Sequence, residues 1–232
     1  MSNRPPPPHF QGFDPQGILT TYQRHLPHWR QPGATYFVTF RLADSVPRSV
    51  LELVERLRRE CELRSHEPAA KSLREECERK SRNLLEASLD EGHGACVLRD
   101  ELNVEILRGR LAHGLGTQHF LGCGVVMPNH VHAIICPFEG FPLEDILGQV
   151  KAYSAIKINS RSGARGRLWQ EESYDRIIRD EEHLYRVIQY IGRNPLKCNH
   201  PSPNSIRWVH PEWIAAGWGF EDGRISFESA TG

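Results

Sequence analysis

The chain has 232 residues and a formal net charge of zero, because 29 lysines and arginines balance 29 aspartates and glutamates. This length can bury one substantial core, so one or two domains are expected. The neutral charge excludes a global basic field for nucleic acid, and any such binding must come from local patches. No signal-peptide core and no apolar run of roughly 18 residues is found, so we expect a cytosolic protein with no membrane partner.

The six cysteines are scattered along the chain, and no two of them form a C-x-x-C pair. This spacing argues against a zinc ribbon and against a compact disulfide scaffold. In the cytosol the six thiols should stay reduced and behave as small hydrophobic side chains.

The first half of the chain predicts a strand followed by helical segments. Residues 1–28 open with four prolines and predict a flexible, weakly ordered segment. Residues 29–40 are rich in aromatic and β-branched side chains and predict the first strand. Residues 49–61 have helical apolar spacing, and residues 62–92 interleave arginine and glutamate, which predicts a solvated, charged helical insertion.

The second half predicts strands and then helices. Residues 102–107 fit a short strand or part of a helix. Residues 118–126 lead into an apolar strand that ends near Pro137. Further along, the pattern predicts a helix at 143–158, a basic loop at 159–167, a final helix at 180–193 stopped by Pro195, and a tryptophan-containing tail at 201–232. This order predicts an α+β domain over residues 29–200, with a mostly antiparallel sheet and helices on one face.

Two histidines inside the apolar strand are the most informative feature. His130 and His132 are separated only by Val131. On a strand, alternate side chains project from the same face, so the two imidazoles would lie side by side. Such a pair can bind one metal ion, although a His-x-His taken alone is more often structural.

The final helix supplies a candidate nucleophile. Arg186, Tyr190 and Asn194 are four residues apart and share one helix face. A metal held by the histidines and the Asn194 oxygen would lie next to the Tyr190 hydroxyl. A tyrosine hydroxyl is a poor nucleophile at neutral pH unless its electrophile is polarised, as a metal-bound phosphodiester is. The predicted reaction is therefore attack of Tyr190 on a DNA phosphate, which gives a covalent phosphotyrosine.

Less specific interpretations of the same residues stay open. Tyr190 could be an ordinary half-buried helix aromatic. Asn194 could cap the helix end before Pro195 instead of binding a metal. The rival nucleophiles are Tyr153, Tyr174 and Tyr185.

Several ordered sequence blocks resemble the single-tyrosine HUH transposases, and within them the branch of REP-associated tyrosine transposases. The blocks are Met-Pro-Asn-His-Val-His at 127–132, Leu-Trp-Gln at 168–170, Tyr-Asp-Arg at 174–176, Ile-Arg-Asp at 178–180, and Tyr-Ile-x-x-Asn-Pro at 190–195. The resemblance covers about residues 30–200. The charged segment at 62–92 and the tryptophan-rich tail depart from the simplest family pattern.

The resemblance implies a ferredoxin-like antiparallel sheet with helices on one face. It also implies cleavage of single-stranded DNA near hairpins, a divalent metal (Mg²⁺ or Mn²⁺) and a 5′-phosphotyrosine intermediate. By motif match, His130 and His132 are the metal ligands and Tyr190 is the nucleophile. Asn194 is the proposed third ligand, at a position that varies among these enzymes. The family pattern fits a monomer or a homodimer.

Basic residues from the end of the predicted helix at 143–158 onward point to a nucleic-acid partner, because cations can neutralise phosphates and an aromatic ring can stack on an unpaired base. The DNA-binding candidates are Lys157, Arg161, Arg165, Arg167, Trp169, Arg176, Arg179 and Arg186. An ordinary solvated loop at 161–167 and a packing role for Trp169 are equally acceptable interpretations.

Two other functions compete with the nicking enzyme. The first is a non-cleaving hairpin DNA-binding protein derived from a transposase. The second, a phosphohydrolase or nucleotidyl transferase of the histidine-triad kind, is set aside because it needs a further histidine at position 134, where the chain has isoleucine.

Overall fold

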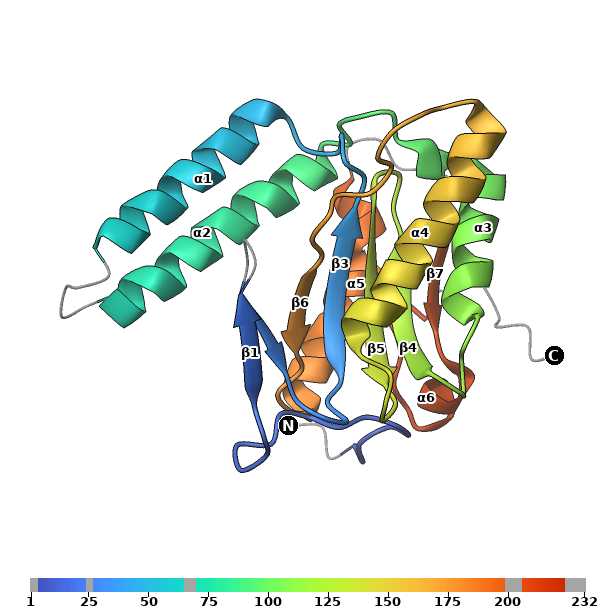
Figure 1. Cartoon of the computed structure of the whole chain (residues 1–232). Coiled ribbons are helices and arrows are strands. Elements are labelled where there is room, and N and C mark those ends of the chain that lie inside the picture. Colours follow the sequence, from blue (N-terminus) through green and yellow to red (C-terminus); the bar gives the residue numbers. More distant parts are fainter. Residues whose placement is uncertain (1–3, 24–26, 65–69, 199–205, 224–232) are drawn as a thin grey trace.

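The computed structural model describes residues 4–23, 27–64, 70–198 and 206–223 (Figure 1). The strands are β1 (Thr20–Gln23), β2 (Pro27–Arg30), β3 (Tyr36–Arg41), β4 (His119–Val126), β5 (His130–Pro137), β6 (Tyr174–Ile177) and β7 (Ile206–Val209). The α-helices are α1 (Arg48–Leu63), α2 (Ala70–Asp90), α3 (Glu101–Ala112), α4 (Leu143–Ser162), α5 (Glu181–Lys197) and α6 (Pro211–Ala215), with a short 3₁₀ turn at Val97–Arg99.

Five strands form one antiparallel sheet in the order β6-β3-β5-β4-β7. Along the chain, β3, α3, β4, β5, α4 and β6 follow the βαββαβ order of a ferredoxin-like fold. The predicted α+β fold with an antiparallel sheet is therefore confirmed. The segment at 102–107, for which strand and helix were both open, belongs to α3.

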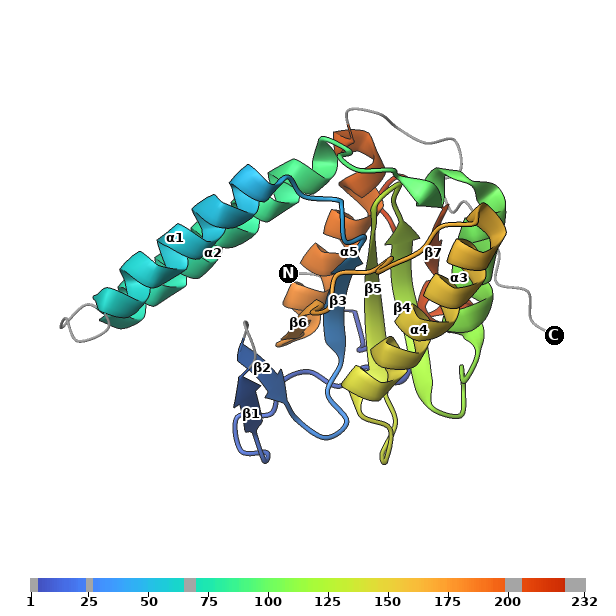
Figure 2. The same cartoon turned by 45° about the horizontal axis from the view of Figure 1, so that its top comes forward.

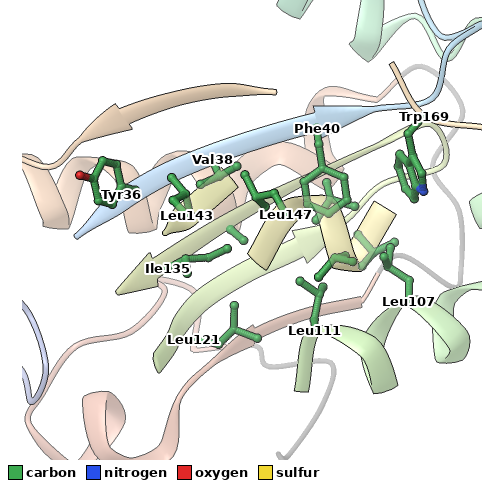
Figure 3. Close-up of a cluster of buried hydrophobic side chains, with 14 of the residues drawn as sticks. Tyr36, Val38, Phe40, Leu107, Leu111, Leu121, Ile135, Leu143, Leu147 and Trp169 are labelled. Atoms are coloured by element: carbon green, nitrogen blue, oxygen red, sulfur yellow. The ribbon is translucent and has the colours of Figure 1, made fainter. Parts of the chain in front are cut away.

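One face of the sheet is covered by α3 and α4. Alternate residues of the central strands point to this side, including Val38, Phe40 and Ile135, and they pack against Leu107 of α3 and Leu147 of α4 (Figure 3). All five side chains are buried. This apolar layer is the main core of the domain.

The opposite face is covered by α5. The side chains that alternate with the first set along each strand, such as Phe37, Val125 and Ile134, point to this face. They pack there against Leu184 and Ile188 of α5. The predicted placement of helices on one face thus holds for α3 and α4 but not for α5. The reason is that β4 and β5 are buried on both faces, so both faces need cover.

Two helices extend further than predicted. The first, α4, continues to Ser162, which places Arg161 on a helix and not in a loop. The second, α5, continues through Pro195 to Lys197. Pro195 lies within the last turn; because it has no N–H, it leaves the Ile191 carbonyl without its intrahelical donor, and the helix ends two residues later at Lys197.

The ends of the chain are packed onto the domain wherever they are described. The indole of Trp213 donates to the Pro8 carbonyl at 2.8 Å, and that of Trp218 donates to the Pro5 carbonyl at 2.9 Å. Trp208 lies in β7, which pairs with β4. The prediction of a weakly ordered lead-in and a separate tail is therefore corrected for residues 4–23 and 206–223, because the tryptophans fix the proline-rich segment. The parts of both predictions at 1–3, 24–26, 201–205 and 224–232 lie outside the described residues.

The helices α1 and α2 form a hairpin that projects away from the sheet in both orientations (Figures 1 and 2). Ion pairs one helical turn apart, such as Arg48–Glu52 and Lys80–Glu76, lie on its solvent side. The segment predicted as a charged helical insertion, 62–92, contains the end of α1 and the whole of α2. Within the described ranges, no helix is both long and apolar enough to cross a membrane.

Candidate active site

The two histidines of β5 face α5 and are almost completely buried, with 1% of His130 and 2% of His132 exposed. Their ring centroids are 4.7 Å apart and the ring planes are inclined by 74°. Successive side chains of a strand point to opposite faces of the sheet. The two histidines therefore share the α5 face, while Val131 between them points into the core under α4. The predicted side-by-side arrangement of the two imidazoles is present.

Asn129 orients the ring of His130. The amide nitrogen of Asn129 donates to the carbonyls of Leu89 and His93, at 3.3 Å each. Its amide oxygen is therefore the atom that faces His130, at 2.8 Å from Nδ1. That contact requires a proton on Nδ1, which leaves Nε2 with a free lone pair.

Thr39 on the neighbouring strand β3 holds His132. Its Oγ1 lies 2.7 Å from Nδ1 of His132, directly across the strand pair. When Nδ1 donates to this hydroxyl, the lone pair of Nε2 is left available, which is the usual arrangement behind a metal-bound histidine. Burial is the main cause that lowers the pKa of both rings, to about 4 for His130 and well below the ordinary value for His132. Both imidazoles are thus neutral at pH 7, the form that binds metal.

Tyr190 and Asn194 reach the histidines from α5. The Tyr190 ring lies 5.2 Å from the His132 ring, centroid to centroid, and meets Phe37 edge-on at 5.8 Å. Asn194 is 1% exposed, and its Oδ1 lies 3.3 Å from Nε2 of His130. Because α5 runs on past Asn194, this residue is not a cap at the helix end.

The contact between His130 and Asn194 fits a cation. With the proton of His130 on Nδ1, a lone pair of Nε2 faces the acceptor oxygen of Asn194, and a positive charge between them would satisfy both atoms. Neighbouring ligands of an octahedral ion with bonds of about 2.1 Å are roughly 3 Å apart, close to the 3.3 Å spacing here. No group of three or more His, Cys, Asp or Glu side chains suited to a metal is found in the described residues, so the amide oxygen would complete the set.

The rival tyrosines lie elsewhere or are otherwise engaged. Tyr153 is on α4, across the sheet from the histidines, and is 45% exposed. The hydroxyl of Tyr185 donates to Glu221 at 2.8 Å. Tyr174 lies on the edge strand β6 and accepts a hydrogen bond from Arg82 at 3.2 Å. Among these candidates, only Tyr190 has its ring against His132.

Three supporting residues were given no role by sequence reasoning. Thr39 and Arg41 alternate along β3 on the same face as the histidines, opposite His132 and His130 respectively. Arg41 is partly buried and contacts the Ser45 hydroxyl at 3.3 Å. Asn129 stands inside the recognised block, but its hydrogen bonds to residues 89 and 93 could not be inferred from sequence spacing. The polar positions of β3 were the only available signal.

The DNA-binding candidates do not form one surface. Lys157 and Arg161 lie on α4, on the other face of the sheet from the histidine pair, where Arg161 pairs with Asp100. Arg167 pairs with Glu171, and Arg186 pairs with Glu182. Two others are close to α5, since Arg176 contacts His183 and Arg179 donates its backbone N–H to the same ring. Arg165 is exposed.

Trp169 is a core residue. Only 4% of it is exposed, its indole N–H donates to the Ser154 hydroxyl at 2.9 Å, and its ring packs on Phe40 at 5.0 Å. An indole held in this way is not free to stack on an unpaired base. The packing interpretation of Trp169 therefore replaces its proposed contact with DNA.

No protein-family model matches the chain, and no curated protein matches its sequence. Among solved structures, the fold is similar to that of a REP-associated tyrosine transposase bound to a REP hairpin. The match has a TM-score of 0.41 and 16% sequence identity, and it covers 72% of this chain and 70% of that one. Similarity at this level does not by itself show a shared function, so the residues of the site have to carry the functional conclusion.

Proposed function

We propose that the protein nicks and transfers single-stranded DNA through a covalent 5′-phosphotyrosine on Tyr190, at hairpin or repetitive extragenic palindromic DNA. The observation that carries the proposal is the position of the Tyr190 ring against His132. Next to this pair, Nε2 of His130 and Oδ1 of Asn194 face each other with their lone pairs. The motif resemblance independently selects the same four residues.

The site can supply each element that this reaction needs. His130, His132 and Asn194 would hold a divalent ion, Mg²⁺ or Mn²⁺, which when bound polarises a phosphate oxygen. Asn129 and Thr39 keep the two rings in the orientation that ligation requires. Tyr190 provides the nucleophilic oxygen.

Burial works against a free tyrosinate at this position. Burial, together with the nearby carboxylates of Glu86 and Asp90, raises the pKa of Tyr190 well above its ordinary value. The hydroxyl is therefore protonated at pH 7, and its proton must leave as the new bond to phosphorus forms. The raised pKa also suppresses side reactions of Tyr190, because it keeps the hydroxyl from ionising before the DNA is bound.

The direct test mixes the protein with 3′-end-labelled hairpin DNA that carries single-stranded flanks, with and without manganese, and separates the products on a denaturing gel. We expect a labelled protein band that needs the metal, disappears in Tyr190→Phe and persists in the matched control Tyr185→Phe. Binding in a native gel without any covalent band would instead favour the non-cleaving DNA-binding protein.

A further inference from the structure

Two of the six cysteines lie on the projecting hairpin of α1 and α2. Cys61 is in the last turn of α1, and Cys77 is in the first half of α2. Both are partly exposed, whereas the other four cysteines are buried. Because oxidation of a thiol depends on access, an oxidant in solution reaches this pair more readily than the other four.

A hydrogen bond between the two helices brings the cysteines together. The thiol of Cys77 donates to the carbonyl oxygen of Leu57, with 3.1 Å between the sulfur and the oxygen. In an α-helix that carbonyl also accepts the backbone N–H of the residue four positions later, which is Cys61. The sulfur of Cys77 therefore touches the turn of α1 that ends at Cys61.

The two side chains also lean toward each other. Side chains on an α-helix point back toward its N-terminus. The two helices of the hairpin run in opposite directions (Figures 1 and 2). Cys61 therefore leans back toward Leu57, and Cys77 leans toward the end of α1, where Cys61 lies.

The surroundings of Cys77 make it a poor first nucleophile. Burial, and then the neighbouring Cys61 thiol, raise the pKa of Cys77, while Arg58 acts in the opposite direction. Its proton is also donated to the Leu57 carbonyl. Since the thiolate is the reactive form of a cysteine, we assign the first attack on an oxidant to Cys61 and the second to Cys77.

We propose that Cys61 and Cys77 form a reversible disulfide that braces the α1–α2 hairpin when a peroxide reaches the protein. The Cys61 thiolate attacks one oxygen of hydrogen peroxide, and the O–O bond breaks with its electron pair leaving on hydroxide, which gives a sulfenic acid. The Cys77 thiolate then attacks the sulfur of that acid. The S–S bond forms, and the S–O bond breaks with its electron pair leaving on a second hydroxide. The two thiol protons convert both hydroxides to water, so two thiols are oxidised and one peroxide is reduced.

This inference goes beyond the nicking function and does not depend on it. The test treats the full chain with hydrogen peroxide, blocks the remaining thiols and digests the protein with trypsin without reduction. Trypsin releases Cys61 in peptide 60–64 and Cys77 in peptide 75–79, each with a single cysteine. We expect these peptides to be linked, at a mass two hydrogen atoms below their sum, and to separate again in dithiothreitol. The number of free thiols should fall from six to four.

Single-cysteine variants and the unfolded chain are the controls. Cys61→Ser and Cys77→Ser should give no linked peptide, and in Cys77→Ser a sulfenic-acid trap such as dimedone should label Cys61. In urea the preference for this pair should disappear, because the fold selects it. Three results would overturn the proposal: a pair that stays unlinked while buried cysteines are oxidised, a link between two chains, or equal selectivity in urea. A trap that does not label Cys61 would overturn the assigned order of attack.

The bracing is tested by hydrogen exchange of α1 and α2 in reduced and oxidised protein. Closing the loop at 62–76 restricts the open state, so exchange through opening of the hairpin should slow by on the order of 100-fold. Cys61→Ser treated with peroxide in the same way should exchange at the rate of its untreated form. Equal exchange in reduced and oxidised wild type would show that the disulfide does not brace the hairpin.

Discussion

The two faces of β5 differ, because one carries an apolar core and the other carries a buried polar cluster. Val131 and Ile135 point toward α4 and lie in a closed apolar layer. His130 and His132, each one position away from Val131, point toward α5 and meet Asn194 and Tyr190. All four strand side chains are buried, so burial alone does not distinguish the two faces. The two faces differ in the kind of side chain that is buried: the histidines have ring nitrogens that need polar partners, and the valine and isoleucine have no such atoms.

The α5 face is itself divided. Toward the end of β5, Ile134 packs with Leu184 and Ile188 as an ordinary core. At the start of the strand, the same face carries the histidines, with Thr39 and Arg41 beside them on β3. A buried polar cluster of this kind is costly unless each member is hydrogen-bonded or binds an ion. The apolar half therefore fixes α5, while the polar half forms the site for which the nicking function is proposed.

The largest expected effect comes from removing an imidazole on the α5 face. We expect His132→Gln to reduce metal-dependent adduct formation more than about 100-fold, because loss of a ligand should cost at least as much as loss of a residue that supports one. The rate is measured against manganese concentration. An unchanged rate at low manganese would show that His132 is not a metal ligand.

The complementary change is on the α4 face of the same strand. Ile135→Ala should lower the free energy of unfolding by about 2–5 kcal/mol, since it leaves a cavity in a closed apolar layer. The rate of adduct formation per folded molecule should be unchanged. Urea unfolding together with the adduct assay at low temperature checks both. A specific loss of rate in the folded protein would show that the two faces are not independent.

A smaller effect is expected from the support of His132. Thr39→Val keeps the shape of the side chain but removes the hydroxyl that lies 2.7 Å from Nδ1. We expect metal affinity to fall by about 10- to 100-fold, the usual effect of losing such a partner. Thr39→Ser, which keeps the hydroxyl, is the matched control and should behave like wild type. Titration of manganese against the adduct rate separates the two variants.

The smallest expected effect is on stability at low pH. Burial and the neighbouring arginines, Arg176 first, lower the pKa of His183 to about 4. The unfolded chain takes up a proton near pH 6.5 and the folded one does not, so the stabilisation is complete above pH 6.5 and is lost as the pH falls toward 4. In His183→Gln, the loss of unfolding free energy between pH 7 and pH 5 should be smaller by roughly 1–2 kcal/mol. Urea unfolding at both pH values measures it, and an identical pH dependence in both proteins would contradict the assignment.

Local patterns were sufficient to predict the elements that carry the site. The alternation around His130 and His132 predicted β5 and the face that the imidazoles share. The four-residue spacing of Tyr190 and Asn194 predicted one face of α5. These predictions succeeded because strand and helix periodicity depend on neighbouring residues alone.

The remaining features depend on contacts between distant segments. The continuation of α5 past Pro195 and the burial of Trp169 against Phe40 are set by tertiary packing, which overrides a local stop signal or an apparent stacking residue. The contact of α2 with the site, where the Asn129 amide donates to the Leu89 carbonyl, depends on how the α1–α2 hairpin joins the sheet. No spacing within residues 62–92 carried that information.

The measurement that tests the account most directly is mass spectrometry of the covalent adduct after digestion with nuclease and trypsin. Cleavage after Arg186 and Arg193 releases residues 187–193, which contain Tyr190 and no other tyrosine. The account predicts a nucleotide phosphate on this peptide, formed only when metal is present. A nucleotide on a peptide carrying Tyr153, Tyr174 or Tyr185, or a peptide 187–193 that is always unmodified, would contradict it.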